Sequence, residues 1–256
     1  MKFEDLDTKM RVFETAHDQY ILPKIFIVIR LDGRGFTRQT KDVWKLEIPF
    51  DTQFRDIMLA TTEHLFEIGF SVVYGYTQSD EISILLRRDD ATFSRKVRKL
   101  ISVTAGEASS HFTLSMGKLA CFDARICQLP TESLVHDYFR WRQEDAHRNA
   151  LNAHCYWLLR RSGKAAQQSA KQLMGLSVSE KNELLFQSGI NFNDLPLWQK
   201  RGAAVYVEDY QKPALNPKTG ESVLASRRRL KRDLELPMGE QYGDFIDRIT
   251  ASGVRV

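Results

Sequence analysis

Carboxylates stand at two places in the sequence where a buried strand would give way to a turn. Asp32 follows the apolar run 25–31, and Asp80 with Glu81 lies between two short apolar segments. Carboxylate oxygens are ligands that Mg²⁺ prefers, and two such ions about 4 Å apart can serve phosphoryl or nucleotidyl transfer. The pattern therefore predicts two-metal chemistry, provided that the fold brings these carboxylates together.

The residues after Asp32 suit a phosphate chain. Gly33 permits close approach of its backbone carbonyl to a metal ion, and the polar segment 34–37 can turn backbone N–H groups toward a triphosphate. Each signal has an ordinary alternative, because Asp-Gly is a common turn pair and Asp-Glu at a hairpin tip is often only solvated. Their joint placement is what favours a functional site.

The elements that must position these residues follow the order β-α-β-β-α-β. Strands are predicted at residues 25–31, 71–76, 82–86 and 118–127. A helix capped by Asp51 is predicted to run to about Ile68, and another begins near Thr92. This α+β order is the split ferredoxin-like arrangement, also found in polymerase palms. Its first and third strands are central neighbours, so Asp32 would lie near Asp80.

The rest of the chain is predicted to be mainly helical. Helices are expected at residues 2–17 and 133–161, and Ser177 with Glu180 forms a capping box before a further one. A terminal hairpin is expected from 203–210 and 222–225, with its turn at 216–220. We expect a palm-like catalytic region at 1–130 and a helical region at 131–256, packed as one unit.

Composition sets the class of protein but not its activity. The chain has 256 residues and a net charge of +4, which suits a polyanionic partner but is also ordinary for an enzyme. Basic residues cluster, most densely at 227–232, and any single cluster is more often a solvated face. Three cysteines without a CxxC pair argue against a disulfide framework or a four-thiolate zinc site. With no targeting or membrane-spanning segment evident, a soluble cytoplasmic protein is expected.

Four segments in order resemble the tRNA-His guanylyltransferase (Thg1) family and its Thg1-like branch. They are 30–36 with its Asp-Gly-Arg, 78–83 with its Ser-Asp-Glu, 141–149, and 181–186 followed by 189–193. The similarity spans roughly residues 20 to 205. It implies a palm-type fold and a homotetramer, with tRNA and nucleoside triphosphates as partners.

The resemblance assigns roles to particular residues. Two Mg²⁺ ions would be bound by Asp32, the Gly33 carbonyl and Asp80, with Glu81 supporting this catalytic site. Nucleotide-binding residues would be Gly33, Arg34, Gly35, Phe36, Ser79 and Lys45. Contacts to tRNA or nucleotide would come from His147, Asn149, Lys181, Arg228 and Arg229. For His147 the alternative is a packing role, shared with His154 two helical turns away.

The sequence also departs from the family pattern. Ala150 and Ala153 stand where the family usually carries Asn, and Ile48 precedes Pro49 where the family has a lysine, which leaves Lys45 as the nearest one. These departures favour the Thg1-like group, whose members resemble tRNA 5′-end repair enzymes. The implied reaction is 3′–5′ addition: ATP adenylylates a 5′-monophosphate, and the 3′-hydroxyl of GTP or another nucleotide then displaces AMP.

Three alternatives stay open at this stage. The first is addition of a single guanylate to tRNA-His. The second is a nucleotide cyclase or forward polymerase, which would use the same carboxylates on the same palm. The third is a catalytically silent RNA-binding module, against which the presence of both Asp32 and Asp80 argues.

Overall fold

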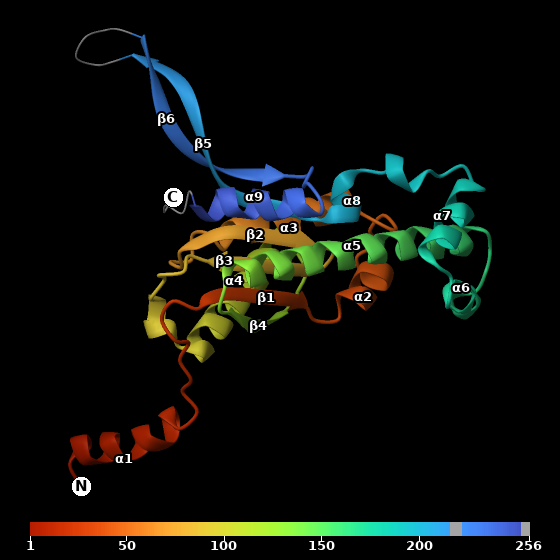
Figure 1. Cartoon of the computed structure of the whole chain (residues 1–256). Coiled ribbons are helices and arrows are strands. Elements are labelled where there is room, and N and C mark those ends of the chain that lie inside the picture. The colour runs from red at the N-terminus through yellow and green to blue at the C-terminus, as the bar shows by residue number, and fades with distance from the viewer. Residues whose placement is uncertain (216–221, 252–256) are drawn as a thin grey trace.

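The computed structural model describes residues 1–215 and 222–251 and is built around one antiparallel sheet (Figure 1). The strands are β1 (Phe26–Gly33), β2 (Val72–Gln78), β3 (Glu81–Leu86), β4 (Phe122–Leu129), β5 (Ala203–Leu215) and β6 (Ser222–Asp233). Their order is β4-β1-β3-β2-β5-β6. The first four strands therefore have the predicted ferredoxin-like order, with β1 and β3 as central neighbours. The division into a catalytic region at 1–130 and a helical region at 131–256 stays a prediction. Strands from both regions build this one sheet.

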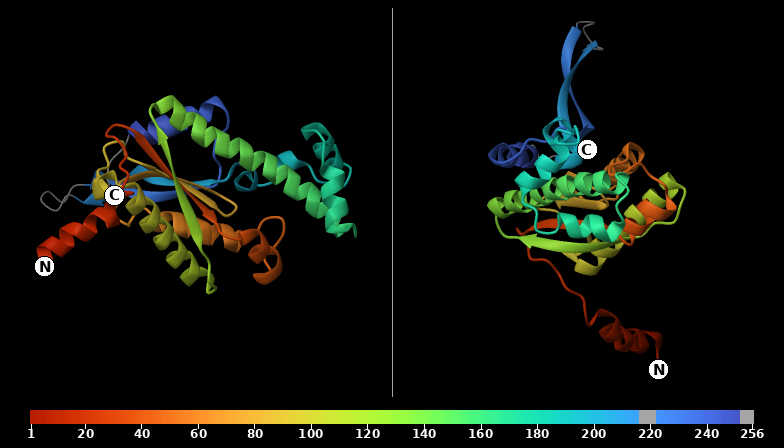
Figure 2. Two further views of the ribbon diagram at one scale, coloured as in Figure 1. Left: turned by 90° about the horizontal axis from the view of Figure 1, so that it is seen from below. Right: turned by 90° about the vertical axis from the view of Figure 1, so that its right-hand side faces the viewer.

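Helices cover both faces of the sheet (Figure 2). The longer helices are α1 (Phe3–Thr15), α3 (Thr52–His64), α4 (Val97–Met116), α5 (Glu132–Arg161) and α9 (Glu240–Ala251). The shorter helices are α2 (Phe36–Arg38), α6 (Ala166–Leu173), α7 (Val178–Phe186) and α8 (Leu197–Arg201). Side chains of α3 and α4 pack on one face, and those of α5 and α9 pack on the other.

The central strand β1 shows why the sequence folds this way. Its side chains alternate between two cores: Ile27, Ile29 and Leu31 face α3 and α4, while Phe26 and Val28 face α5 and α9. An almost continuous apolar run is what a strand covered on both faces requires. The alternation also determines that the polar residues at its end, Arg30 and Asp32, share the face of Phe26 and Val28.

Local signals placed several helices correctly. The Asp51 side chain accepts a hydrogen bond from the Phe54 amide at the start of α3, and Ser177 forms the predicted capping box with Glu180 at α7. The predicted boundaries moved by a few residues elsewhere, because α3 ends at His64 and β4 covers 122–129. Helix ends and strand ends are where sequence patterns carry least information.

The connection between β2 and β3 is tighter than the sequence predicted. Instead of a polar loop at 77–81, the strands run to Gln78 and from Glu81, so Ser79 and Asp80 alone form the turn. Ser79 adopts the left-handed backbone conformation with φ of 53°, which is uncommon for a residue other than glycine. The short turn fixes Asp80 directly at the end of the central strands.

The N-terminal helix α1 and the hairpin of β5 and β6 extend from the body (Figures 1 and 2). β5 and β6 continue past the rest of the sheet as a two-stranded arm, while the turn predicted at 216–220 lies outside the described residues. Helix α1 buries none of its side chains. None of the helices within 1–215 and 222–251 has the length and apolar character needed to cross a membrane.

We predict that Phe112→Ala lowers the free energy of unfolding by about 3–5 kcal/mol, the usual range for removing a buried ring. Phe112 is fully buried on α4 and contacts the rings of Phe36, Trp44 and Phe122. Leu114→Ala on the same helix, where the side chain is 82% exposed, should leave the free energy of unfolding nearly unchanged. Urea denaturation measures both, and equal losses would contradict this account of the core.

Candidate active site

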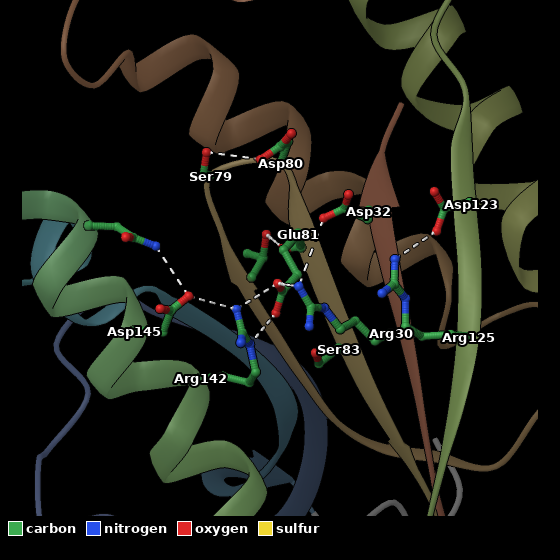
Figure 3. Close-up of polar contacts among 12 residues, drawn as sticks. Arg30, Asp32, Ser79, Asp80, Glu81, Ser83, Asp123, Arg125, Arg142 and Asp145 are labelled. Atoms are coloured by element: carbon green, nitrogen blue, oxygen red, sulfur yellow. Dashed lines mark hydrogen bonds and ion pairs between the residues drawn. The ribbon is translucent and has the colours of Figure 1, made fainter. Parts of the chain in front are cut away.

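The carboxylates predicted from the sequence meet at one end of the sheet (Figure 3). Asp32 on β1 lies directly opposite Glu81 on β3, and Asp80 occupies the adjoining turn. The Gly33 amide donates a hydrogen bond of 3.0 Å to the Asp80 carbonyl, which ties the turn to the end of β1. The fold therefore brings together the two segments whose carboxylates were expected to converge.

Asp32 and Asp80 carry negative charge that the protein balances only weakly. Burial raises the pKa of the Asp80 carboxyl, and the neighbouring Asp32 adds to this shift. The nearest cationic group to Asp32 is Arg30, with a nitrogen-to-oxygen distance of 4.0 Å. A bound cation would favour the ionised form of the Asp80 carboxyl.

These groups fit magnesium in the manner typical of phosphate-handling sites. Within residues 1–215 and 222–251 no cluster of three or more His, Cys, Asp or Glu could enclose a metal. Mg²⁺ usually keeps waters and takes one or two carboxylates plus substrate phosphates. Asp32, Asp80 and the Gly33 carbonyl could supply that incomplete set of ligands.

Glu81 forms a buried ion pair and is not free to act as a ligand. Its carboxylate accepts hydrogen bonds of 2.6 and 2.8 Å from Arg142 of α5, and Arg30 lies 2.5 Å away (Figure 3). Arg142 also contacts Asp145 at 3.1 Å. Burial raises the pKa of Glu81, while the two guanidinium groups oppose this shift. The contact joins the long helix α5 to β3, the strand that begins directly after Asp80.

The segment after Asp32 contains both buried and exposed residues. A side chain at Gly33 would collide with the Phe36 ring, because an added Cβ would lie 2.5 Å from it. Phe36 is fully buried, so its side chain is part of the core and only its backbone could meet a nucleotide as predicted. Arg34 and Gly35 are exposed, and Gly35 has φ of 73° immediately before α2.

A pocket with aromatic walls adjoins the carboxylates. It is lined by residues of the segment 40–51 and of α3, together with Thr77, Gln78, Ser79, Trp157, Trp198 and Ala203. The Arg55 guanidinium lies over the Trp198 ring at 4.7 Å from its centre. Lys41 lines the pocket, whereas Lys45, the predicted lysine, is not among its lining residues. Ser79 contributes to both the pocket and the cleft that holds Asp32 and Asp80.

The polar residues predicted on α5 lie on two different sides of the helix. Asn149 lines the carboxylate cleft and donates a hydrogen bond to Asp145. His147 packs instead against Phe192, with ring centres 5.3 Å apart, and His154 contacts the same ring at 6.0 Å. Burial lowers the pKa of His147, and Lys200 with Arg201 adds to this effect. The shared packing face considered from the sequence is therefore present.

The other predicted contact residues do not line the cleft that holds the carboxylates. The Lys181 carbonyl on α7 accepts a hydrogen bond from the Cys155 thiol of α5. Arg228 and Arg229 lie on β6 in the arm, where they pair with Asp209 and Glu208 of β5. Much of the basic run at 227–232 is thus matched by acidic residues on the opposite strand.

Arg30, Arg142 and Asp145 belong to the site but carry no sequence pattern that marks them individually. Arg142 and Asp145 stand three residues apart, which places them on one face of a helix. Nothing in that spacing indicates that the face points at Glu81. The signal that could have identified these arginines is the burial of Glu81, because a buried carboxylate needs a cationic partner.

The fold and the site define a palm-type nucleotidyltransferase. The family model described as tRNAHis guanylyltransferase matches residues 7–130, and the model described as Thg1 C terminal domain matches residues 133–245. The chain belongs to the tRNA-His guanylyltransferase family, whose members are nucleotidyltransferases acting on the 5′ end of tRNA.

Individual relatives agree with this assignment. A probable tRNA(His) guanylyltransferase of Drosophila melanogaster is 35% identical over 195 residues, covering 72% of this chain and 68% of the relative. The structure of a bacterial tRNA(His) guanylyltransferase-like protein in complex with ATP superposes with a TM-score of 0.73 at 28% identity, covering 96% and 99% of the two chains. A structure of such a bacterial protein in complex with GTP gives 0.72 at 27% identity, with the same coverage.

We predict that Arg142→Met destabilises the protein by about 2–3 kcal/mol, because the buried Glu81 carboxylate loses two charged hydrogen bonds and keeps only its contact with Arg30. Arg140→Met is the matched control on the same helix, since Arg140 pairs with Glu144 at the surface, and it should change stability little. Thermal and chemical denaturation report the effect. If the two variants unfold alike, the Glu81 pair does not hold α5 to the sheet.

Proposed function

We propose that this protein adds nucleotides in the 3′–5′ direction to the 5′ end of tRNA. The observation that carries the proposal is the Asp32 and Asp80 pair beside the aromatic pocket. The names of the relatives favour addition of a single guanylate to tRNA-His, and templated repair of a shortened 5′ end is compatible with the same site. We further propose a cytoplasmic location, where its thiols would remain reduced.

The nucleotide is proposed to bind with its base in the pocket and its phosphates toward Ser79. Trp157 and Trp198 offer apolar surface to a base, and Lys41 offers positive charge. ATP and GTP, which accompany the two bacterial structures, are the nucleotides that we propose for this chain. Arg34 and the backbone of residues 35–37 would meet the phosphates.

Two Mg²⁺ ions bound at Asp32, Asp80 and the Gly33 carbonyl would supply charge neutralisation for in-line attack at phosphorus. The protein's own part is positioning. The Ser79–Asp80 turn is fixed by the Gly33 amide, and the Glu81 ion pairs hold the strand beneath it. With reactants held in this way, adenylylation and nucleotide addition can proceed without a covalent enzyme intermediate.

We propose that the tRNA crosses the cleft and the face of α5. Asn149 already lies in the cleft, so it is the predicted contact best placed to meet the 5′ end. His147 and Lys181 would contact RNA at a greater distance from the metals. Arg228 and Arg229, which lie on the arm, would contact RNA phosphates in place of the acidic side chains with which they now pair.

We also propose a homotetramer, consistent with the predicted family assembly. Helix α1 presents four apolar side chains to solvent at the spacing of a helix-pairing face: Phe3, Leu6, Met10 and Phe13. Contact with another copy would remove this apolar stripe from water.

The direct test uses 5′-monophosphorylated tRNA-His, either full length or lacking its first nucleotide, with Mg²⁺, ATP and the four nucleoside triphosphates. We expect extension at the 5′ end, and a loss of at least about 1,000-fold in Asp32→Ala and Asp80→Ala, which remove the metal ligands. Asp89→Asn, a change of an exposed carboxylate paired with Arg87, should retain activity.

The products separate the remaining alternatives. One guanylate added only to full-length tRNA-His identifies the narrower activity, and filling of the shortened end identifies repair. Cyclic nucleotide or growth at a 3′ end would replace the proposal with a cyclase or a forward polymerase. RNA binding without any chemistry in the folded parent protein would identify a binding module.

We predict that Met10→Glu with Phe13→Glu lowers the assembly state, because it places charge on the apolar stripe of α1. Thr8→Glu adds charge to the same helix away from the stripe. Sedimentation velocity should show smaller particles for the first variant alone. Unchanged sedimentation of both variants would remove α1 from the proposed interface.

A further inference from the structure

The sheet face that carries the active carboxylates continues onto the edge strand β4. In the register, Asp32 pairs with Glu81 on one side and Asp123 on the other, and Arg30 pairs with Ser83 and Arg125. Residues directly opposite each other in neighbouring strands project from the same face. One row of carboxylates and one row containing two arginines therefore lie side by side at this end of the sheet (Figure 3).

The arginines near the carboxylates differ in exposure and in how many of their N–H donors already bind a protein carboxylate. Arg142 is 8% exposed and Arg30 is 20% exposed, and both bind the Glu81 carboxylate. The Arg125 side chain is 58% exposed and contacts Asp123 through one terminal nitrogen at 3.2 Å. A guanidinium carries five N–H donors, so this contact leaves most of the Arg125 fork available to a ligand.

Helix α5 leaves this part of the face open. Along β4, Leu129 is buried against α5 and α9 and Cys127 packs at the margin of that core, whereas Arg125 and Asp123 are exposed. The surface around Arg125 is thus continuous with the carboxylate row. It is not part of the nucleotide pocket, which is built largely from α3 and the segment 40–51.

In-line transfer places the attacking and leaving oxygens on opposite sides of the reacting phosphorus. If the nucleotide occupies the pocket, the acceptor end must approach the carboxylates from elsewhere, and the open face beside β4 offers such an approach. An RNA 5′ end carries a terminal phosphate and, one nucleotide on, a phosphodiester. A guanidinium fork is well matched to either group.

We propose that Arg125, oriented by Asp123, binds the 5′-terminal phosphate of the RNA acceptor. The inference rests on the proposed function but names a subsite and its ligand, which can be measured without turnover. Asp123 is the positioning residue, since its carboxylate holds the guanidinium over the face shared with Arg30. The alternative is that Arg125 and Asp123 form only a solvated ion pair on an edge strand and do not bind RNA.

The first measurement is equilibrium binding without ATP, using the full-length protein and one tRNA prepared with a 5′-monophosphate or a 5′-hydroxyl. The parent protein should prefer the phosphorylated form, and Arg125→Ala should reduce that preference about tenfold or more, as expected for loss of a charged hydrogen bond. Arg125→Lys should keep part of it. Arg140→Ala, the matched control with a 57% exposed side chain, should keep all of it.

The second measurement is the kinetics of 5′-adenylylation. Arg125→Ala should raise the KM for tRNA and leave the KM for ATP unchanged, and Asp123→Asn should have the same effect at smaller size. Equal phosphate preference in parent protein and Arg125→Ala overturns the inference, as does a rise in the KM for ATP alone. If the parent protein shows no turnover but retains a phosphate preference that depends on Arg125, the proposed reaction fails while this subsite stands.

Discussion

The ion pair between Glu81 and Arg142 is the contact on which the active site depends. It is buried, with both side chains 8% exposed, and it joins the central strand β3 to the helix α5. Taking two charges out of water is costly, and apolar residues of similar size often stabilise a fold as well. The value of this pair lies in its geometry. It fixes the strand next to Asp80 and the face of α5 that carries Asp145 and Asn149.

The same contact explains how unlike charges are distributed over the sheet. Glu81 takes up Arg142 and Arg30, so those arginines cannot fully neutralise Asp32 and Asp80. Two carboxylates are thereby held close together with little compensation. Burial raises the pKa of Asp80, and the charge of Asp32 adds to this shift. Such an arrangement suits a site whose cations arrive with polyphosphate substrates.

The sequence contained enough information for the order of the strands and for the meeting of Asp32 with Asp80. Apolar runs, the Asp51 cap and the Ser177 capping box act locally, and local signals can be recognised without a structure. Cross-strand register is different. The pairing of Arg229 with Glu208, and the row that joins Asp123 to Asp32, depend on alignments that no single strand specifies. The left-handed Ser79 is also set by its surroundings, since serine does not require that conformation.

The rotation of α5 about its own axis decides what its departures from the family pattern mean. Arg142, Asp145, Asn149 and Ala153 lie at helical spacing and line the cleft, whereas Ala150 is buried among Leu151, Leu159 and Leu185. Alanine in place of the family's asparagine therefore has a different structural effect at position 150 than at position 153. Ala150 removes a polar group from a place where it would need a buried partner. Ala153 replaces a longer side chain in the cleft wall beside Asn149, so it is the departure that bears on the proposed contact with the 5′ end.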